Sequence, residues 1–221
     1  MIDPKAFFKV SYGLYLVSSG DEQKGNAFVS NTVFQVSADP VKFAVCSNKN
    51  NFTTSIIQDK GVFAVSVLDL ETPAEIHGNY GFKSGRDTDK LKNARVKYGE
   101  SGVPIVLDSA IAWFEFKVIE TVDVGTHMMF IGELLNSELI DERAEPLTYA
   151  YYHKVKNGLS PKNAPTYIER SEIKEKPKGK TYKCLICGYE HEMPEGQTMD
   201  DLPDDWTCPV CATDKDSFEE I

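Results

Sequence analysis

Two Cys-x-x-Cys pairs in the last forty residues of the sequence restrict the fold more than any other feature. They are Cys184/Cys187 and Cys208/Cys211. Two such hairpins allow four thiolates to converge tetrahedrally on one ion, which suits zinc or iron. The fifth cysteine, Cys46, stands alone in an apolar stretch and is interpreted as a buried thiol. The pattern predicts a metal site rather than the disulfide framework of a secreted protein.

The residues around the cysteines favour iron. The stretches "YKCLICGY", "DLPDDWTCPVC" and "KDSFEE" resemble rubredoxins, small electron carriers with one iron bound by four cysteines. The resemblance implies that the four paired cysteines are the ligands, and that the small core contains Tyr182, Tyr189, Trp206 and Phe218. Aromatic burial keeps water from the sulfurs and tunes a redox centre, which a structural zinc site does not need. A zinc ribbon remains the alternative.

Two departures from the rubredoxin pattern stand in this region. The interval from Cys187 to Cys208 is shorter than in the usual rubredoxin, so part of the intervening loop is missing. Ala212 occupies the place where the family has glycine, and we expect a positive φ there that disfavours alanine. Neither departure removes a ligand, but both could expose the iron or shift its potential.

The formal charge of −10 is concentrated at the same end of the chain. Residues 188–221 contain eleven carboxylates and one lysine, so the remainder is neutral. An acidic segment repels nucleic acid and would steer towards a basic protein surface. We therefore expect no nucleic-acid partner. No secretion signal or membrane-spanning run is recognised, which predicts a soluble, cytoplasmic protein.

The preceding sequence alternates short apolar stretches with turn residues. Strand-length runs include "GLYLVSSG", "NAFVSN", "VKFAVCSN", "VFAVSVL", "IAWFEFKVIE" and "MMFIGELLNSE". Two stretches between them, 51–61 and 71–81, have helix-spaced apolar positions with a glycine behind. The predicted fold class is mainly β, a barrel with short helices and a small metal-binding domain. The expected boundaries are a barrel over 1–168, a lysine-rich linker over 169–179 and a small domain over 180–221.

The barrel region resembles the flavin reductase family with the FMN-binding split barrel. The resemblance rests on "KGNAFVSNTVFQVSADPVKFAVCSNKNNFTTSII", followed in order by "FKSGRDTDK" and "VGTHMMFIGEL". It implies an FMN site near a helix start, where backbone N–H groups and the helix dipole favour a phosphate. The cofactor-binding residues so implied are Asn31, Thr32, Ser47, Asn48, Lys49, Asn51, Thr53, Ser84 and Arg86. His127 resembles the family histidine near flavin and nicotinamide, and is the expected catalytic residue; a structural role is the alternative.

The combination of the two regions closely resembles the high-molecular-weight rubredoxins of anaerobes. That resemblance implies an NAD(P)H-dependent oxidoreductase in which NADH reduces FMN by hydride transfer and the flavin passes single electrons to the iron. It also implies a flavodiiron (type A) flavoprotein that reduces nitric oxide or dioxygen as the acceptor. The resemblance to split-barrel reductases, which form homodimers with FMN near the interface, implies a homodimer.

Three other functions remain open at this stage. The chain could release reduced flavin to a monooxygenase and use the cysteines as a zinc ribbon. It could be a flavin-free binding module that docks on a protein through that ribbon. Ferric reduction could also be its principal reaction.

Overall fold

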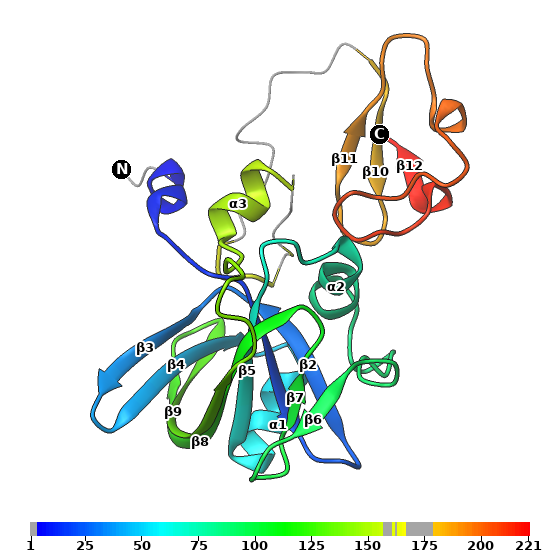
Figure 1. Cartoon of the computed structure of the whole chain (residues 1–221). Helices are drawn as coiled ribbons and strands as arrows, with labels where there is room; N and C mark the ends of the chain where they lie inside the picture. Colours follow the sequence, from blue (N-terminus) through cyan, green and yellow to red (C-terminus); the bar gives the residue numbers. More distant parts are fainter. Residues whose placement is uncertain (1–3, 157–160, 162, 167–178) are drawn as a thin grey trace.

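The computed structural model of the chain describes residues 4–156, 161, 163–166 and 179–221. The larger part is built on one antiparallel sheet of seven strands in the order β2-β1-β5-β8-β9-β4-β3 (Figure 1). The strands of this sheet are β1 (Tyr15–Gly20), β2 (Gly25–Ser30), β3 (Val33–Ala38), β4 (Val41–Asn48), β5 (Val62–Leu68), β8 (Ala110–Asp123) and β9 (His127–Leu139). A separate hairpin consists of β6 (Val96–Tyr98) and β7 (Pro104–Val106). The predicted mainly β fold class is confirmed.

The six strands expected from the apolar runs are all present, with small differences at their ends. The edge strand β3 was not predicted. It pairs only with β4, and its Phe34 and Val36 are 47% and 46% exposed. Because an edge strand that faces solvent on both sides lacks a buried face, its sequence gives a weak periodic signal.

Aromatic side chains fill the centre of the curved sheet. Phe63, Phe116 and Phe130 are fully buried, and the rings of Phe63 and Phe116 stack with centroids 5.0 Å apart. The long strands β8 and β9 pair along most of their length and contribute two of these rings. This core holds the strand ends that carry the polar residues described below.

The first helix, α1 (Phe52–Lys60), begins and ends as its sequence predicts. The Asn51 side chain caps it by accepting the amide of Thr53 at 3.0 Å, and Gly61 ends it at φ 65°. The helix contacts β1, β2 and β4, so it connects the two halves of the sheet. Its first turn therefore lies at the carboxyl end of β4, where the phosphate site was expected.

The second predicted helix is divided into two parts. Residues 71–81 form only α2 (Ala74–His77), followed directly by a π-helical turn, η2 (Gly78–Phe82). Glycine at positions 78 and 81 weakens a regular helix, since glycine loses more conformational freedom on folding than other residues. Two further short helices, η1 (Pro4–Lys9) and α3 (Tyr149–Lys154), were not predicted.

The cysteine-containing part forms a small domain of its own. Its three-stranded sheet has the order β11-β10-β12, from β10 (Thr181–Cys184), β11 (Glu190–Glu192) and β12 (Phe218–Glu220). Two short 3-10 helices, η4 (Met199–Asp201) and η5 (Lys215–Ser217), complete it. The expected aromatic core is present: Tyr182, Trp206 and Phe218 pack with Met193 and Met199.

Most of the predicted linker, residues 169–178, lies outside the described residues. In the described part of the chain the small domain sits beside α2 (Figure 1). Within that same part, no helix is long and apolar enough to cross a membrane.

Candidate functional site

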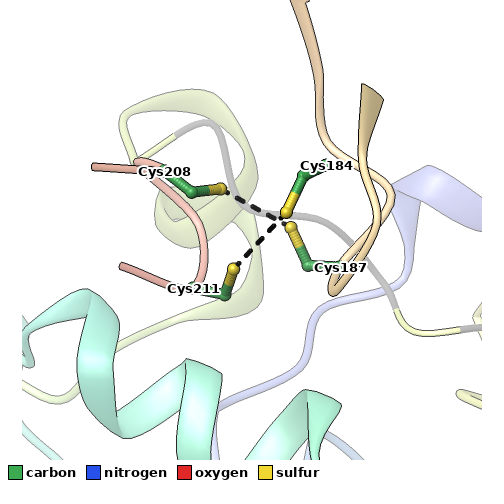
Figure 2. A group of neighbouring side chains, drawn as sticks. All are labelled: Cys184, Cys187, Cys208 and Cys211. Carbon is green, nitrogen blue, oxygen red and sulfur yellow. Dashed lines mark hydrogen bonds between the residues drawn. The ribbon is translucent and has the colours of Figure 1, made fainter. Parts of the chain in front are cut away.

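The four paired cysteines meet at one point. Their sulfur atoms all lie within 4.8 Å of one another (Figure 2). Cys184 Sγ is 3.8 Å from Cys211 Sγ, and Cys187 Sγ is 3.6 Å from Cys208 Sγ. A tetrahedral ion with metal–sulfur bonds of about 2.3 Å separates its sulfur ligands by about 3.8 Å. The sulfurs are therefore arranged to hold one tetrahedral metal ion.

The two Cys-x-x-Cys turns have the same geometry. Each has a residue with positive φ directly after its second cysteine, Gly188 at 77° and Ala212 at 56°. The amide of that residue donates to the carbonyl of the first cysteine at 2.8 Å in both turns, Gly188 to Cys184 and Ala212 to Cys208. The expected positive φ at Ala212 is confirmed. An alanine is held in a conformation that favours glycine.

Apolar groups surround the sulfurs on most sides. Cys184, Cys208 and Cys211 are buried with Val210, and Tyr189 and Phe218 pack against them. The close thiols share hydrogen bonds, which lower the pKa of the Cys208 thiol and raise the pKa values of Cys187 and Cys211. A bound cation would favour the thiolate form of all four. The shell is of the kind that limits water access to a redox metal.

One residue of the larger domain belongs to this shell. Phe82, the last residue of η2, packs against the cysteine cluster. At the other end of the same turn, a Cβ added to Gly78 would lie 2.4 Å from the carbonyl oxygen of Cys211. The backbone of η2 therefore touches the backbone of the second cysteine hairpin.

A cavity of about 690 Å³ lies between the two domains. This volume falls in the range typical of cofactor and ligand pockets. One wall comes from the cysteine domain, including residues 183–188, together with Glu219 and Ile221. The opposite wall comes from the larger domain and includes five of the predicted site residues: Asn31, Asn48, Asn51, Ser84 and His127.

Two of these residues use their amides to hold a neighbouring segment of chain. Asn31 Nδ2 donates to Thr166 Oγ1 at 3.1 Å, and Asn48 Nδ2 donates to the Asn163 carbonyl at 3.1 Å. Asn31 Oδ1 accepts the hydroxyl of Thr32 at 3.0 Å. The 163–166 segment thus lies beside the cavity and is fixed to β4 and to the end of β2.

The other five predicted cofactor contacts are not among the residues that line the cavity: Thr32, Ser47, Lys49, Thr53 and Arg86. Two of them are buried behind the cavity wall. The hydroxyls of Ser47 and Thr54 are 2.6 Å apart, and Thr53 Oγ1 accepts the amide of Asn26 at 2.8 Å. These hydrogen bonds join α1 to β2 and β4, so they position the wall.

The two predicted cationic contacts bind protein groups. Lys49 Nζ forms an exposed ion pair with Asp123 at 2.7 Å. Arg86 Nη1 donates to the Asn50 carbonyl at 2.9 Å, and its guanidinium lies 5.4 Å from the centre of the Phe52 ring. Arg86 therefore fastens the loop that begins α1, and Asn50 and Phe52 both line the cavity.

His127 begins β9 and faces the cavity. It is 7% exposed, and its Nδ1 is 2.8 Å from the hydroxyl of Thr126. Its Nε2 is buried and has no hydrogen-bond partner among the described residues. Burial lowers the pKa of this imidazole, and the nearby backbone of Asn163 opposes the shift. A buried ring nitrogen without a partner beside a cavity is suited to a ligand that hydrogen-bonds there.

Two cavity residues were missed from the sequence. His77 is 3% exposed, and neither ring nitrogen has a hydrogen-bond partner among the described residues. Lys90 is 5% exposed, and burial lowers its pKa to about 8. Its Nζ donates to the carbonyls of Ala27 at 3.2 Å and Tyr80 at 3.1 Å. No local pattern indicates either burial, because Lys90 is held by carbonyls of β2 and η2 and His77 packs against Tyr152 of α3.

Comparison with known protein families agrees with the two-domain division. A flavin reductase like domain matches residues 7–158, and a rubredoxin matches residues 181–218. The chain therefore belongs to the flavin reductase-like family and carries a rubredoxin domain. The cysteine site is accordingly of the iron-binding type, and the predicted fusion is confirmed.

Two relatives show how these domains are combined elsewhere. The chain is 41% identical to the high molecular weight rubredoxin of Moorella thermoacetica over 230 residues, which cover both chains completely. It is 44% identical over 168 residues to the ferric-chelate reductase (NAD(P)H) of Archaeoglobus fulgidus, covering 76% of this chain and 99% of the relative. The second alignment has the length of the flavin reductase part alone.

Solved structures support the fold of the larger domain. Flavoredoxin from Methanosarcina acetivorans superposes with a TM-score of 0.55 at 25% identity, covering 60% of this chain and 70% of its own. The NADH:FAD oxidoreductase of Streptomyces globisporus gives a TM-score of 0.61 at 21% identity, covering 68% and 92%. The curved sheet is thus the split barrel of flavin reductases, and the chain is a flavin-dependent oxidoreductase.

Proposed function

We propose that the protein carries electrons from NADH through FMN to an iron ion in the four-cysteine site, and from there to a flavodiiron flavoprotein. The observation that carries this proposal is the shared cavity. One wall consists of polar residues of the flavin reductase domain, and the other contains Cys184 and Cys187. A flavin in this cavity would lie beside the metal ligands.

The reaction balances as two one-electron steps for each hydride. NADH gives up a hydride, which carries two electrons and one proton, and becomes NAD⁺. An iron ion held by Cys184, Cys187, Cys208 and Cys211 would accept these electrons one at a time, in two reductions of Fe(III) to Fe(II), and one proton would be released. A bound flavin supplies the conversion between two-electron and one-electron chemistry.

The residues around the cavity have separate proposed roles. Asn31, Asn48, Asn51 and Ser84 offer polar groups to the isoalloxazine edge and the phosphate. His127 Nε2 is buried beside the cavity without a hydrogen-bond partner of normal geometry among the described residues, so it could hydrogen-bond the flavin or the nicotinamide. Ser47, Thr53 and Arg86 support the loop at the start of α1 through the hydrogen bonds described above, and Thr32 does the same for Asn31.

The proposed protein acceptor is supported by the charge of the iron domain and by the similarity of this chain to a diflavin flavoprotein. The iron domain has a strongly acidic surface, which steers it towards a basic partner. Diflavin flavoprotein A 1 of Synechocystis is 24% identical over 153 residues, which cover 69% of this chain and 26% of that protein. We include in the proposal a cytoplasmic homodimer whose acceptor reduces nitric oxide or dioxygen.

Ferric reduction is the second candidate, and the relative at 44% identity favours it. The two functions differ in what the iron domain contributes. Reduction of a ferric chelate by the flavin does not require the four-cysteine centre, whereas delivery to a flavoprotein does.

The experiment compares the two acceptors in the same preparation. Anaerobic NADH oxidation is measured with a purified flavodiiron protein and with a ferric chelate, for the full chain and for Cys208→Ser. The proposal predicts that the variant loses flavodiiron reduction and keeps chelate reduction. Equal loss of both activities, or no loss of either, would contradict it.

A further inference from the structure

One turn of the larger domain, η2, contacts the second cysteine hairpin. In η2, Gly78 faces the carbonyl oxygen of Cys211 and Phe82 packs on the cysteine cluster. Phe82 also lines the 690 Å³ cavity. This turn, Gly78–Phe82, is called the docking turn below.

Glycine at position 78 is explained by the neighbouring domain and not by its own backbone. Gly78 has φ −57° and ψ −52°, an ordinary helical conformation that any residue adopts. A Cβ there would approach the Cys211 carbonyl to 2.4 Å and its carbonyl carbon to 3.1 Å. Since both obstructing atoms belong to the backbone, a side chain at this position would require the domains to separate.

The surroundings of this contact are loosely packed. A second cavity of about 410 Å³ adjoins the docking turn on the Cys211 side. Leu185 and Ile186 border both cavities and remain 63% and 45% exposed. Small and incompletely packed interfaces are typical of transient association. A domain held in this way can release and present the same apolar edge to another protein.

We propose that the docking turn is the internal binding site of the iron domain, and that Phe82 is a positioning residue which holds the four-cysteine centre against the flavin cavity. This inference rests on the proposed function. In the docked arrangement, reduced FMN in the cavity would supply one electron to Fe(III) held by the four cysteines, giving Fe(II). Release from the turn would then let the iron domain reduce its external acceptor. Correct placement of two reacting centres accelerates a transfer strongly.

The test uses the full chain with FMN and iron bound, and Gly78→Ala as the principal variant. Gly81→Ala is the matched control, because Gly81 lies in the same turn and its added Cβ would meet only Val29, at 3.7 Å. Small-angle X-ray scattering reports domain separation without catalysis. We expect a larger maximum dimension for Gly78→Ala than for Gly81→Ala or the unchanged chain. Equal dimensions for all three would overturn the proposal.

Anaerobic stopped-flow with NADH then separates the two electron-transfer steps. Flavin content is measured on each variant first, because the turn borders the cavity. We expect flavin bleaching at the unchanged rate in Gly78→Ala, and iron bleaching slowed by about tenfold or more. Phe82→Ala provides an independent variant if Gly78→Ala does not fold, with the same expected slowing. Unchanged iron bleaching in both folded variants would refute the role of the turn.

The same traces distinguish this failure from failure of the proposed function. If the iron of the unchanged chain is never reduced after the flavin bleaches, electron relay itself is wrong. If it is reduced in the unchanged chain and equally fast in the variants, only the docking proposal fails.

Discussion

The imidazole of His77 packs against the phenol ring of Tyr152 with ring centroids 4.6 Å apart and planes inclined by 49°. Burial, assisted by the positive charge of Lys156, lowers the pKa of His77 to about 4. The histidine is therefore neutral in the folded protein at pH 7. It joins α2 to α3 directly before the turn that contacts the iron domain.

This burial predicts a loss of stability in mild acid. The unfolded chain binds a proton at His77 below its ordinary pKa near 6.5, whereas the folded chain does not until about pH 4. The contribution is complete above pH 6.5 and is lost as the pH falls through this window. Between pH 7 and pH 5 the free energy of unfolding should fall by about 2 kcal/mol from this group.

Urea unfolding at both pH values measures the effect. His77→Phe keeps the ring packing and removes the titration, so its free energy of unfolding should depend less on pH by that amount. The same pH dependence in both proteins would show that His77 is not responsible.

Ala212 predicts a stabilising substitution. Its φ of 56° lies in the left-handed region, which costs an L-residue about 1–2 kcal/mol relative to glycine. Relief of this strain in Ala212→Gly should raise the free energy of unfolding of the iron domain by about 1 kcal/mol, less than the full strain, because the greater freedom of glycine in the unfolded chain opposes the gain. Gly188→Ala, at the equivalent position of the first hairpin, should lower it by a similar amount. Thermal unfolding followed at the iron–thiolate absorption band checks both signs, and a lower melting temperature for Ala212→Gly would contradict the account.

The buried hydrogen bonds of Lys90 should contribute to the stability of the cavity wall. Lys90→Met removes the donor to the carbonyls of Ala27 and Tyr80 and leaves two acceptors without it. The free energy of unfolding should fall by about 2 kcal/mol. Lys92→Met, two residues away on the exposed surface, is the control and should change stability little. Equal stability of the two variants would contradict a structural role for Lys90.

We expect substitution of His127 to slow hydride transfer to the flavin and to leave the amount of bound FMN unchanged. In His127→Phe the ring nitrogen that faces the cavity is lost, while an aromatic ring is kept. We expect FMN content to be unchanged and the rate of flavin bleaching by NADH to fall by about tenfold to a hundredfold. Iron reduction by dithionite in the same variant should be unaffected. Loss of bound FMN with an unchanged bleaching rate per flavin would instead assign His127 to cofactor binding.

Local sequence patterns predict much of this protein. Each Cys-x-x-Cys pair forms a hairpin, so the four-cysteine cluster follows from the spacing of the cysteines. The positive φ at Ala212 follows from the rubredoxin resemblance, because the family has glycine at that place. The strands with alternating apolar residues, such as β8 and β9, and the capped helix α1 follow from periodicity.

Contacts between distant segments are not predictable in this way. Lys49 and Arg86 carry the charge expected of phosphate ligands, yet in the fold they bind Asp123 and the Asn50 carbonyl. The burial of His77 arises only when α3 packs on α2. The approach of Gly78 to Cys211 joins residues of different domains, so no local signal exists for it.

The central claim is electron flow from nicotinamide through flavin to the cysteine-bound iron within one chain. The most direct measurement is an absorption spectrum of anaerobically purified protein, with iron, zinc and flavin assayed on the same sample, before and after addition of NADH. The account predicts FMN and ferric–thiolate bands that both bleach. Flavin bleaching in a sample that contains iron whose band persists, or one zinc and no iron after expression with iron supplied, would contradict it.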